Sequence, residues 1–327
     1  MRRTATSISL RTRLCNGVLE AQKCSLCKER QPIYHRRYSG EWLCERCFKL
    51  SIIERVKRTI SRYELLRYDD RIAVAVSGGK DSLSLLEILQ RIERDFPHAK
   101  LFAVTIDEGI EGYRTECLAV AESFSRSLGI PFLSLSFKEL FGFTLTEAAE
   151  SKVLERLGIN PCTVCGVFRR KALTIAARRL KATVIATAHT LDDVVQTYLL
   201  NLLKGEGNLK PVGLRREGEA VIPRIAPFRT TLQREVALYA YLRKIPFQVR
   251  TCPYTRTSMR DRVRSFLNWY AANRPEALYA FLNRFEQLLK DLEQPAESVC
   301  EICGEPTSRR ICRACELEQL IKEGLKA

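Results

Sequence analysis

Residues 77–82, Ser-Gly-Gly-Lys-Asp-Ser, have the composition of an anion-binding loop. An apolar run rich in β-branched residues precedes them at 72–76, and leucines at helical spacing follow from Leu83 to Leu89. A glycine loop between strand and helix presents backbone N–H groups to phosphates, and Lys80 adds a positive charge. Asp81 and the absence of the upstream glycine exclude a Walker A motif, which leaves an ordinary glycine turn as the alternative.

A second cluster, Ala-His-Thr-Leu-Asp-Asp at 188–193, stands before another apolar helical pattern. One of its carboxylates, Asp193 or failing that Asp192, can handle magnesium or the substrate proton. The alternative is helix capping, because Thr190 suits an N-cap and acidic residues suit a first turn. His189 has the bland alternative of a hydrogen-bonded structural side chain.

Cysteine pairs at both ends of the chain have the spacing of zinc knuckles. The thirteen cysteines of an apparently intracellular chain favour metal over disulfides, and Cys15 is left over as a plain side chain. His35 is a weaker alternative ligand at the first site. The predicted zinc ligands are Cys24, Cys27, Cys44 and Cys47 at one end and Cys300, Cys303, Cys312 and Cys315 at the other.

Three further cysteines stand apart from these pairs. Cys162 and Cys165 form a C-x-x-C before a basic helix predicted at 167–181, and Cys252 lies far downstream. Three thiolates suit an iron–sulfur cluster with one open iron that could present sulfide to an activated carbon. A redox pair or a cysteine persulfide with a disulfide partner are the alternatives. Cys117 lies on an apolar helix face and is expected in the core.

The elements that must position these groups alternate between strand and helix from 71 to about 253. Strands are predicted at 101–106, 131–136 and 183–187, with helices ending near 128 and covering 191–203. This alternation predicts an α/β fold, a parallel sheet with helices on both faces. Ligands of such sheets sit beyond the carboxyl ends of the strands, so 77–82, 106–108 and 188–193 should surround one crevice.

Composition limits the class of protein. The chain has 327 residues and a net charge of +16, which favours a polyanionic partner such as a nucleic acid. No apolar run is long enough for a membrane helix, and no apolar segment of a signal peptide follows the first residues. Helices are predicted at 51–69, 256–273 and 276–292. Arg260, Arg262 and Arg264 would form a basic patch for RNA phosphates, unless they are only a solvated surface.

Several stretches together resemble the tRNA 2-thiolation proteins of archaea and eukaryotes and their relatives that thiolate the T-loop uridine. Residues 77–82 are similar to the PP-loop of the N-type ATP pyrophosphatases. The other similar stretches are 107–114, 162–170, 191–193, 223–227, 235–240, 252–254 and the two terminal cysteine modules.

The resemblance implies a Rossmann-like PP-loop fold, ATP with Mg²⁺, two structural Zn²⁺ ions and a [4Fe-4S] cluster or sulfur relay. The cluster would lie on Cys162, Cys165 and Cys252. The partners it implies are tRNA and a ubiquitin-like sulfur carrier protein, with a homodimer as an option, in the cytoplasm without a membrane. The implied ATP-binding residues are Ala75, Ser77, Gly78, Gly79, Lys80, Asp81, Ser82, Ile106, Arg169 and Ala188.

Two positions depart from the family pattern. Ala188-His189-Thr190 replaces the usual Gly-His-Asn, which puts a methyl group beside the nucleotide. Arg169 stands where T-loop enzymes carry lysine, and together with Tyr113-Arg114 it favours the branch that modifies the wobble uridine.

We therefore expect an ATP-dependent tRNA sulfurtransferase. It would transfer AMP to the uridine C2 oxygen, release pyrophosphate and then introduce sulfur at C2. We expect a zinc module at 1–50, a catalytic domain at 51–254, a helical tRNA-binding segment at 255–295 and a second zinc module at 296–327. The alternatives are T-loop uridine thiolation, a different AMP-forming ligase, and a zinc-finger RNA-binding adaptor without catalysis.

Overall fold

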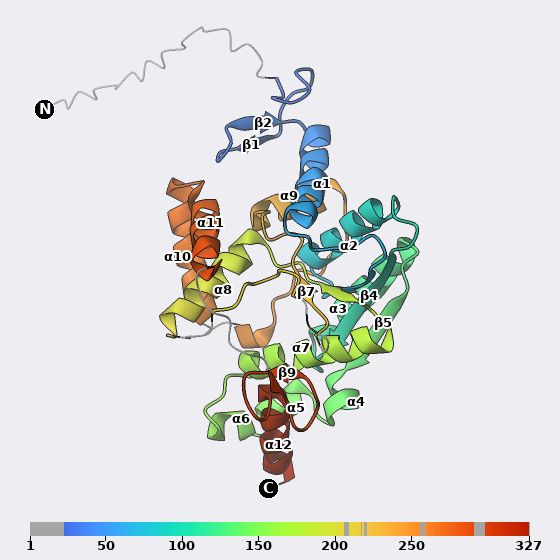
Figure 1. The fold of residues 1–327 in the computed structure, drawn as a ribbon, viewed down its shortest axis with the longest axis vertical. Coiled ribbons are helices and arrows are strands. Elements are labelled where there is room, and N and C mark those ends of the chain that lie inside the picture. Colours follow the sequence, from blue (N-terminus) through green and yellow to red (C-terminus); the bar gives the residue numbers. More distant parts are fainter. Residues whose placement is uncertain are drawn as a thin grey trace, which may run out of the picture. The chain divides into compact units, whose positions relative to one another are not determined.

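The structure is a computed structural model that describes residues 23–205, 209–216, 218, 221–255, 259–290 and 298–326 (Figure 1). Cys15, the residues around Arg256 and the expected helix end at 291–292 lie outside this range. The chain divides into two compact units, one up to Phe48 and one from Lys49 onward.

The first unit holds a short antiparallel hairpin of β1 (Tyr34–Arg36) and β2 (Glu41–Leu43). Its turn contains Gly40, whose positive φ of 72° suits glycine. Across the hairpin the rings of His35 and Trp42 stack with centroids 4.1 Å apart. Helix α1 (Glu45–Arg62) begins earlier than the predicted helix at 51–69.

The second unit is built on a parallel sheet. Within the described residues its strand order is β5-β4-β3-β6-β7, and every neighbouring pair is parallel. The predicted α/β class is therefore confirmed. The strands are β3 (Arg71–Ala75), β4 (Lys100–Asp107), β5 (Phe132–Ser136), β6 (Val184–Ala186) and β7 (Arg224–Ile225).

The order of the strands places a switch point beside β3. After β3 the chain moves outward through β4 to β5, and then returns to β6 on the other side of β3. Right-handed crossovers therefore place α2 (Lys80–Glu93) and α3 (Arg114–Ser127) on one face and α7 (Pro161–Arg179) on the other. The loops after β3 and β6 flank the crevice where open sheets of this kind bind ligands.

The α7 side of the sheet contains an extended apolar core. Four phenylalanines, Phe137, Phe141, Phe143 and Phe168, meet there with centroid distances of 4.8 to 6.4 Å. Three short helices in the segment 137–156 contribute to it, and sequence analysis did not predict them. They are α4 (Phe137–Phe141), α5 (Leu145–Glu150) and α6 (Val153–Arg156).

The C-terminal module belongs to the second unit and shares this core. It consists of β8 (Ser298–Val299), β9 (Pro306–Thr307) and α12 (Arg313–Lys326). Leu317 and Ile321 of α12 are fully buried among the side chains that pack on α7. Two ion pairs also join the module to α7, Arg178 to Glu305 at 2.6 Å and Lys171 to Glu318 at 3.6 Å.

The remaining helices form a layer beside the sheet. α8 (Leu191–Leu203) packs against α10 (Met259–Asn273) and α11 (Ala277–Lys290), and α9 (Gln233–Leu242) packs against α2 (Figure 1). A 3₁₀ turn, η1 (Pro253–Thr255), contacts α7. Within the described part of the chain, no helix has the length and apolar composition needed to cross a membrane.

Candidate active site

The PP-loop after β3 has a backbone that only glycine allows at one position. Gly78 has φ of +81°, and a Cβ atom there would lie 2.4 Å from the carbonyl oxygen of Cys117. The hydroxyl of Ser82 donates to the Gly79 carbonyl at 3.0 Å and accepts from the Ser77 amide at 3.0 Å. These bonds fix the loop in advance, so its remaining amides are available to an anion at little ordering cost.

Arg114 joins the PP-loop to the end of β4. This buried side chain donates to the Ser77 carbonyl at 3.0 Å and to the Ile106 carbonyl at 2.9 Å. Its guanidinium also pairs with Glu108 at 2.9 Å. The carboxyl ends of β3 and β4 are therefore held together by one side chain.

Lys80 and Asp81 line two different cavities. The Lys80 ammonium lies 2.7 Å from Asp81 Oδ2. A cavity of about 250 Å³ on the Asp81 side is also lined by Ser77, Ile106 and Ala188. Among the described residues, Asp81 Oδ1 is buried without a hydrogen-bond partner. Burial raises the pKa of this carboxyl despite the opposing charge of Lys80. An unpartnered carboxylate oxygen of this kind suits a divalent cation.

The second cavity, of about 440 Å³, lies on the Lys80 side. Lys80 lines it from the start of α2 and Asp192 from the start of α8. Gln233 and Arg234 line it from the start of α9, and Asn268 from α10. Asp192 Oδ2 accepts a hydrogen bond from the Gln233 amide at 2.7 Å. Burial raises the pKa of Asp192, and a bound cation would act in the opposite direction by stabilising the carboxylate.

Asp193 has a different environment from its neighbour. Its Oδ2 accepts from the Thr190 amide at 3.0 Å and from the Thr190 hydroxyl at 2.8 Å, which is the capping alternative considered from the sequence. Thr190 is the N-cap of α8, as predicted. Consecutive helical residues point about 100° apart, and here only Asp192 lines the cavity beside Lys80.

His189 has a defined tautomer. The Thr187 hydroxyl donates its single proton to the Ile225 carbonyl at 3.0 Å, so its oxygen accepts from His189 Nδ1 at 2.8 Å. The imidazole is exposed to solvent and lines the cavity of about 250 Å³. Desolvation by the nearby protein lowers the pKa of His189, the charge of Asp193 opposes this, and the charge of Arg260 adds to it. A neutral ring therefore offers Nε2 as an acceptor.

The thiols of Cys162, Cys165 and Cys252 gather at the start of α7. This helix begins at Pro161 rather than at the predicted 167, so the C-x-x-C lies in its first turn, capped by the Asn160 side chain. Cys162 Sγ donates to the Tyr254 carbonyl at 3.1 Å, which fixes it beside η1.

The three thiols also influence one another. Burial is the main cause that raises the pKa of Cys162 and that of Cys165, the latter to about 11, and the charge of Cys252 adds to both. Among the described residues, these three are not a group whose ligand atoms all lie within 4.8 Å of one another. Thiolates that bind different irons stand farther apart than ligands of one ion, so the trio suits a polynuclear cluster better than a single zinc ion.

Arg169 joins this trio to the PP-loop cavity. It lines the cavity, and its guanidinium donates to Glu108 Oε1 at 2.7 Å and to Cys165 Sγ at 3.3 Å. Glu108 therefore bridges Arg169 and Arg114. None of the three cysteines lines the cavity itself, so Arg169 is the side chain through which the phosphate loop and the thiols meet.

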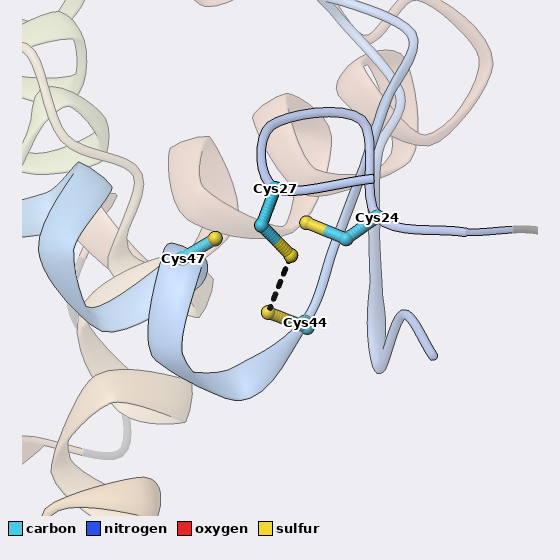
Figure 2. Close-up of side chains that lie close together, drawn as sticks. All are labelled: Cys24, Cys27, Cys44 and Cys47. Atoms are coloured by element: carbon cyan, nitrogen blue, oxygen red, sulfur yellow. Dashed lines mark hydrogen bonds between the residues drawn. The ribbon is translucent and has the colours of Figure 1, made fainter. Parts of the chain in front are cut away.

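Both four-cysteine groups have the geometry of a closed zinc site. The ligand atoms of each group lie within 4.8 Å of one another. Figure 2 shows the side chains of Cys24, Cys27, Cys44 and Cys47 converging, and the sulfurs of Cys27 and Cys44 are 3.9 Å apart. Cys303 and Cys312 are 3.7 Å apart. A tetrahedron with Zn–S bonds of ~2.3 Å requires sulfurs about 3.8 Å apart.

The environment of these groups agrees with metal binding. Burial opposes ionisation of Cys300, but backbone N–H groups, the Cys312 amide at 3.2 Å among them, lower its pKa to about 6. Lys171 donates to Cys315 Sγ at 3.1 Å. His35 stacks on Trp42 and is not part of the first group.

The three arginines of the predicted basic patch do not all lie on one side of α10 and do not form one surface. Arg260 donates to the Thr197 hydroxyl of α8 at 3.1 Å, and Arg264 lies 3.6 Å from Asp261. Arg262 alone of the three is exposed without an ion pair in the described part of the chain.

Sequence analysis also missed contributors to the site. Glu108 and Arg114 belong to a stretch quoted for its resemblance, but no role was given to them because Glu108 meets Arg169 only through the fold. Gln233 and Arg234 were missed because α9 reaches the cavity from a distant part of the chain.

Two family models match the chain. The model of the PP-loop domain matches residues 50–269. The model described as "2-thiouridine synthetase TtuA, N-terminal LIM domain" matches residues 23–49.

Individual relatives match over nearly the full length. The chain is 33% identical over 312 residues to "Cytoplasmic tRNA 2-thiolation protein 1" of Dictyostelium discoideum, covering 94% of this chain and 85% of that protein. It is 34% identical over 316 residues to a "Probable sulfurtransferase" of Methanocaldococcus jannaschii, covering 95% and 92%. Among solved structures, the U34-tRNA thiolase NcsA of Methanococcus maripaludis with its [4Fe-4S] cluster superposes with a TM-score of 0.80, at 30% identity over 91% of this chain and 95% of that one.

Proposed function

The chain belongs to the PP-loop tRNA thiouridine synthetase family, and from that premise we propose that it makes 2-thiouridine at the wobble position of tRNA by adenylation followed by sulfur transfer. Membership in this family makes it an ATP-using tRNA-thiolating enzyme. One observation carries the finer proposal. Arg169 lines the cavity of the PP-loop and also contacts Cys165, so an activated uridine and a sulfur source would meet there.

ATP would occupy the two cavities that the consecutive residues Lys80 and Asp81 line. The loop amides and Lys80 would hold its phosphates, and Ile106 and Ala188 would line the nucleoside side. Asp81, with its unpartnered oxygen, and Asp192 would bind Mg²⁺. Asp193, the carboxylate first preferred from the sequence, would support them by capping α8.

Adenylation would proceed by in-line attack on the α-phosphate. The uridine C2 oxygen forms a bond to the α-phosphorus as N3 loses its proton, and the bond to the leaving pyrophosphate breaks. Lys80 and Arg234 face the cavity on that side, so their charges would stabilise the pyrophosphate as it leaves. The product carbon is a good electrophile because AMP leaves much more readily than oxide.

Sulfur transfer would take place on the α7 side. Cys162, Cys165 and Cys252 would hold a [4Fe-4S] cluster, which supplies an iron without a protein ligand as a position for sulfide. Addition of sulfide at C2 and departure of AMP restore N3–H and leave C2=S. Arg169 contacts both Glu108 and Cys165, so it would place a positive charge between the PP-loop cavity and the cysteine trio.

The proposed function also implies which partners the protein binds. The substrate would be tRNA, which agrees with the net charge of +16, and a ubiquitin-like sulfur carrier protein would deliver sulfur in the cytoplasm. The two four-cysteine groups would hold structural Zn²⁺, because each is closed by four protein ligands. The preference for the wobble position rests on Arg169 and on the named U34 thiolase.

The test is nucleoside mass spectrometry of tRNA from a strain that lacks the gene. We expect 2-thiouridine to disappear from the wobble position and to return with the wild-type gene. Loss from the T-loop instead would support the alternative branch, and unchanged thiolation would refute the proposal.

A matched pair of variants tests the magnesium role. Asp192→Asn should reduce tRNA-dependent pyrophosphate release by about 100-fold or more, the scale of a lost transition-state contact. Asp193→Asn should retain more activity, because an amide oxygen can still accept one capping bond. Equal losses with unchanged thermal stability would contradict this division of roles.

A further inference from the structure

Helix α10 carries an exposed aromatic face that the proposed reaction does not use. Phe266, Trp269 and Tyr270 are exposed by 52%, 64% and 43%. The rings of Phe266 and Tyr270 are stacked 6.2 Å apart, and Trp269 lies 6.2 Å from Phe266. Aromatic side chains of this size are usually buried, so three in contact on the surface of one helix indicate an interaction site.

The geometry of α10 separates this face from its packed side. Val263 and Leu267 are buried against the neighbouring helices, and Asn268 lines the cavity shared with Lys80. At 100° per residue, positions 259, 262, 266, 269, 270 and 273 share the outer side. These are Met, Arg, Phe, Trp, Tyr and Asn, with no acidic residue among them.

The charge on this face favours a polyanion. Arg262, one turn before Phe266, is exposed and makes no ion pair within the described residues. A second copy of the chain would bring the same face, and another Arg262, against it, which charge repulsion disfavours. Unpaired nucleotides instead stack their bases on aromatic rings while arginine pairs with a phosphate.

We propose that the α10 face, formed by Arg262, Phe266, Trp269 and Tyr270, stacks on unpaired nucleotides of the RNA substrate. This inference rests on the proposed function for the identity of the RNA. In this proposal, part of the binding surface for the RNA substrate lies outside the catalytic cavities. The same helix reaches the cavity beside Lys80 with Asn268, so α10 joins RNA capture to the reaction site.

A fluorescence titration tests the stacking directly. The chain has two tryptophans, so Trp42→Phe leaves Trp269 as the only one. A tRNA anticodon stem–loop should quench Trp269 fluorescence saturably, whereas a blunt RNA duplex of equal length should quench it much less. Equal quenching by both RNAs would overturn the proposal, because a duplex has no unpaired base to stack.

Substitutions measure the contribution of the face. Phe266→Ala/Trp269→Ala/Tyr270→Ala should weaken stem–loop binding by about 100-fold or more, given ~1–3 kcal/mol for each stacked base. Tyr241→Ala, an exposed aromatic on α9, is the matched control and should leave the affinity unchanged. Arg262→Ala should reduce the slope of log affinity against log salt by about 0.7, and Arg262→Lys should restore it.

The same experiments also test whether the α10 face binds something other than RNA, such as a second copy of the chain. Unchanged RNA affinity in the correctly folded triple variant would refute the proposal. So would sedimentation showing that the triple variant breaks a dimer while RNA affinity stays the same. The titrations contain no ATP and no sulfur donor, so intact stacking in a protein that fails to thiolate would refute the proposed function and not this surface.

Discussion

The two four-cysteine groups and the cysteine trio at α7 place the same side chain in two different settings. In each four-cysteine group the ligand atoms lie within 4.8 Å of one another and can enclose one ion. At α7 the sulfurs contact Arg169 and the Tyr254 carbonyl instead. A closed set of ligands stabilises a fold, whereas a trio beside a cationic side chain and a cavity leaves room for a reactant.

The largest effect is expected when one cysteine of the trio at α7 is replaced. Cys165→Ser should reduce tRNA thiolation by about 1,000-fold or more, as removal of one member of a catalytic unit does. Zinc content should stay at two ions per chain, measured by mass spectrometry of the metal. Cys117→Ser is the matched control, because its buried thiol only donates to the Tyr113 carbonyl at 3.4 Å, which serine can also do. If Cys165→Ser retained thiolation, the trio at α7 would not differ in function from the two structural four-cysteine groups.

Replacing one cysteine of a four-cysteine group should lower the stability of the fold rather than the rate of thiolation. Cys312→Ser should lower zinc content to one ion per chain and reduce the free energy of unfolding by several kcal/mol, since structural zinc contributes ~10–16 kcal/mol in zinc-finger peptides. Thermal unfolding and metal analysis are the measurements. Below the melting temperature, the remaining folded protein should still thiolate. Full stability without the second zinc ion would contradict the structural role.

A smaller effect is expected at the side chain beside the trio. Arg169→Ala should reduce thiolation by about 10- to 100-fold, the usual cost of losing a partner that orients a metal ligand. Arg169→Lys should recover part of it, because lysine can reach Glu108 or Cys165 but not both with one planar group. Arg179→Ala, on the exposed side of the same helix, is the control. If Arg169→Ala and Arg179→Ala behaved alike, Arg169 would be only a surface charge.

The smallest effect concerns the cavity wall. Ala188→Gly removes the methyl group in which this chain departs from its family, and it should change the KM for ATP by about fourfold at most, the equivalent of one buried CH₂ group of ~0.8 kcal/mol. Steady-state kinetics with varied ATP would measure it. A larger change would mean that Ala188, and not only the PP-loop, sets nucleotide affinity.

The sequence predicted those features that depend on local pattern. Alternating apolar runs located β3, β4, β5 and β6, and C-x-x-C spacing located both four-cysteine groups. The PP-loop was recognisable because glycine and lysine requirements are encoded within six residues.

Features that depend on side-chain direction could not be predicted in the same way. Lys80 and Asp81 are adjacent, yet they line different cavities. The bridge from Arg169 through Glu108 to Arg114 joins three elements and leaves no periodic signal. The division of the arginine patch, by contrast, was accessible from the 100° turn between successive helical residues.

The shared core of α7 and α12 has a practical consequence for anyone who trims or splices this chain. Leu317 and Ile321 belong to the same apolar core as Phe168, so a protein ending before residue 298 would leave part of the core beside α7 unfilled. Homologous modules transplanted onto this scaffold would have to bring matching apolar side chains, and not merely four cysteines.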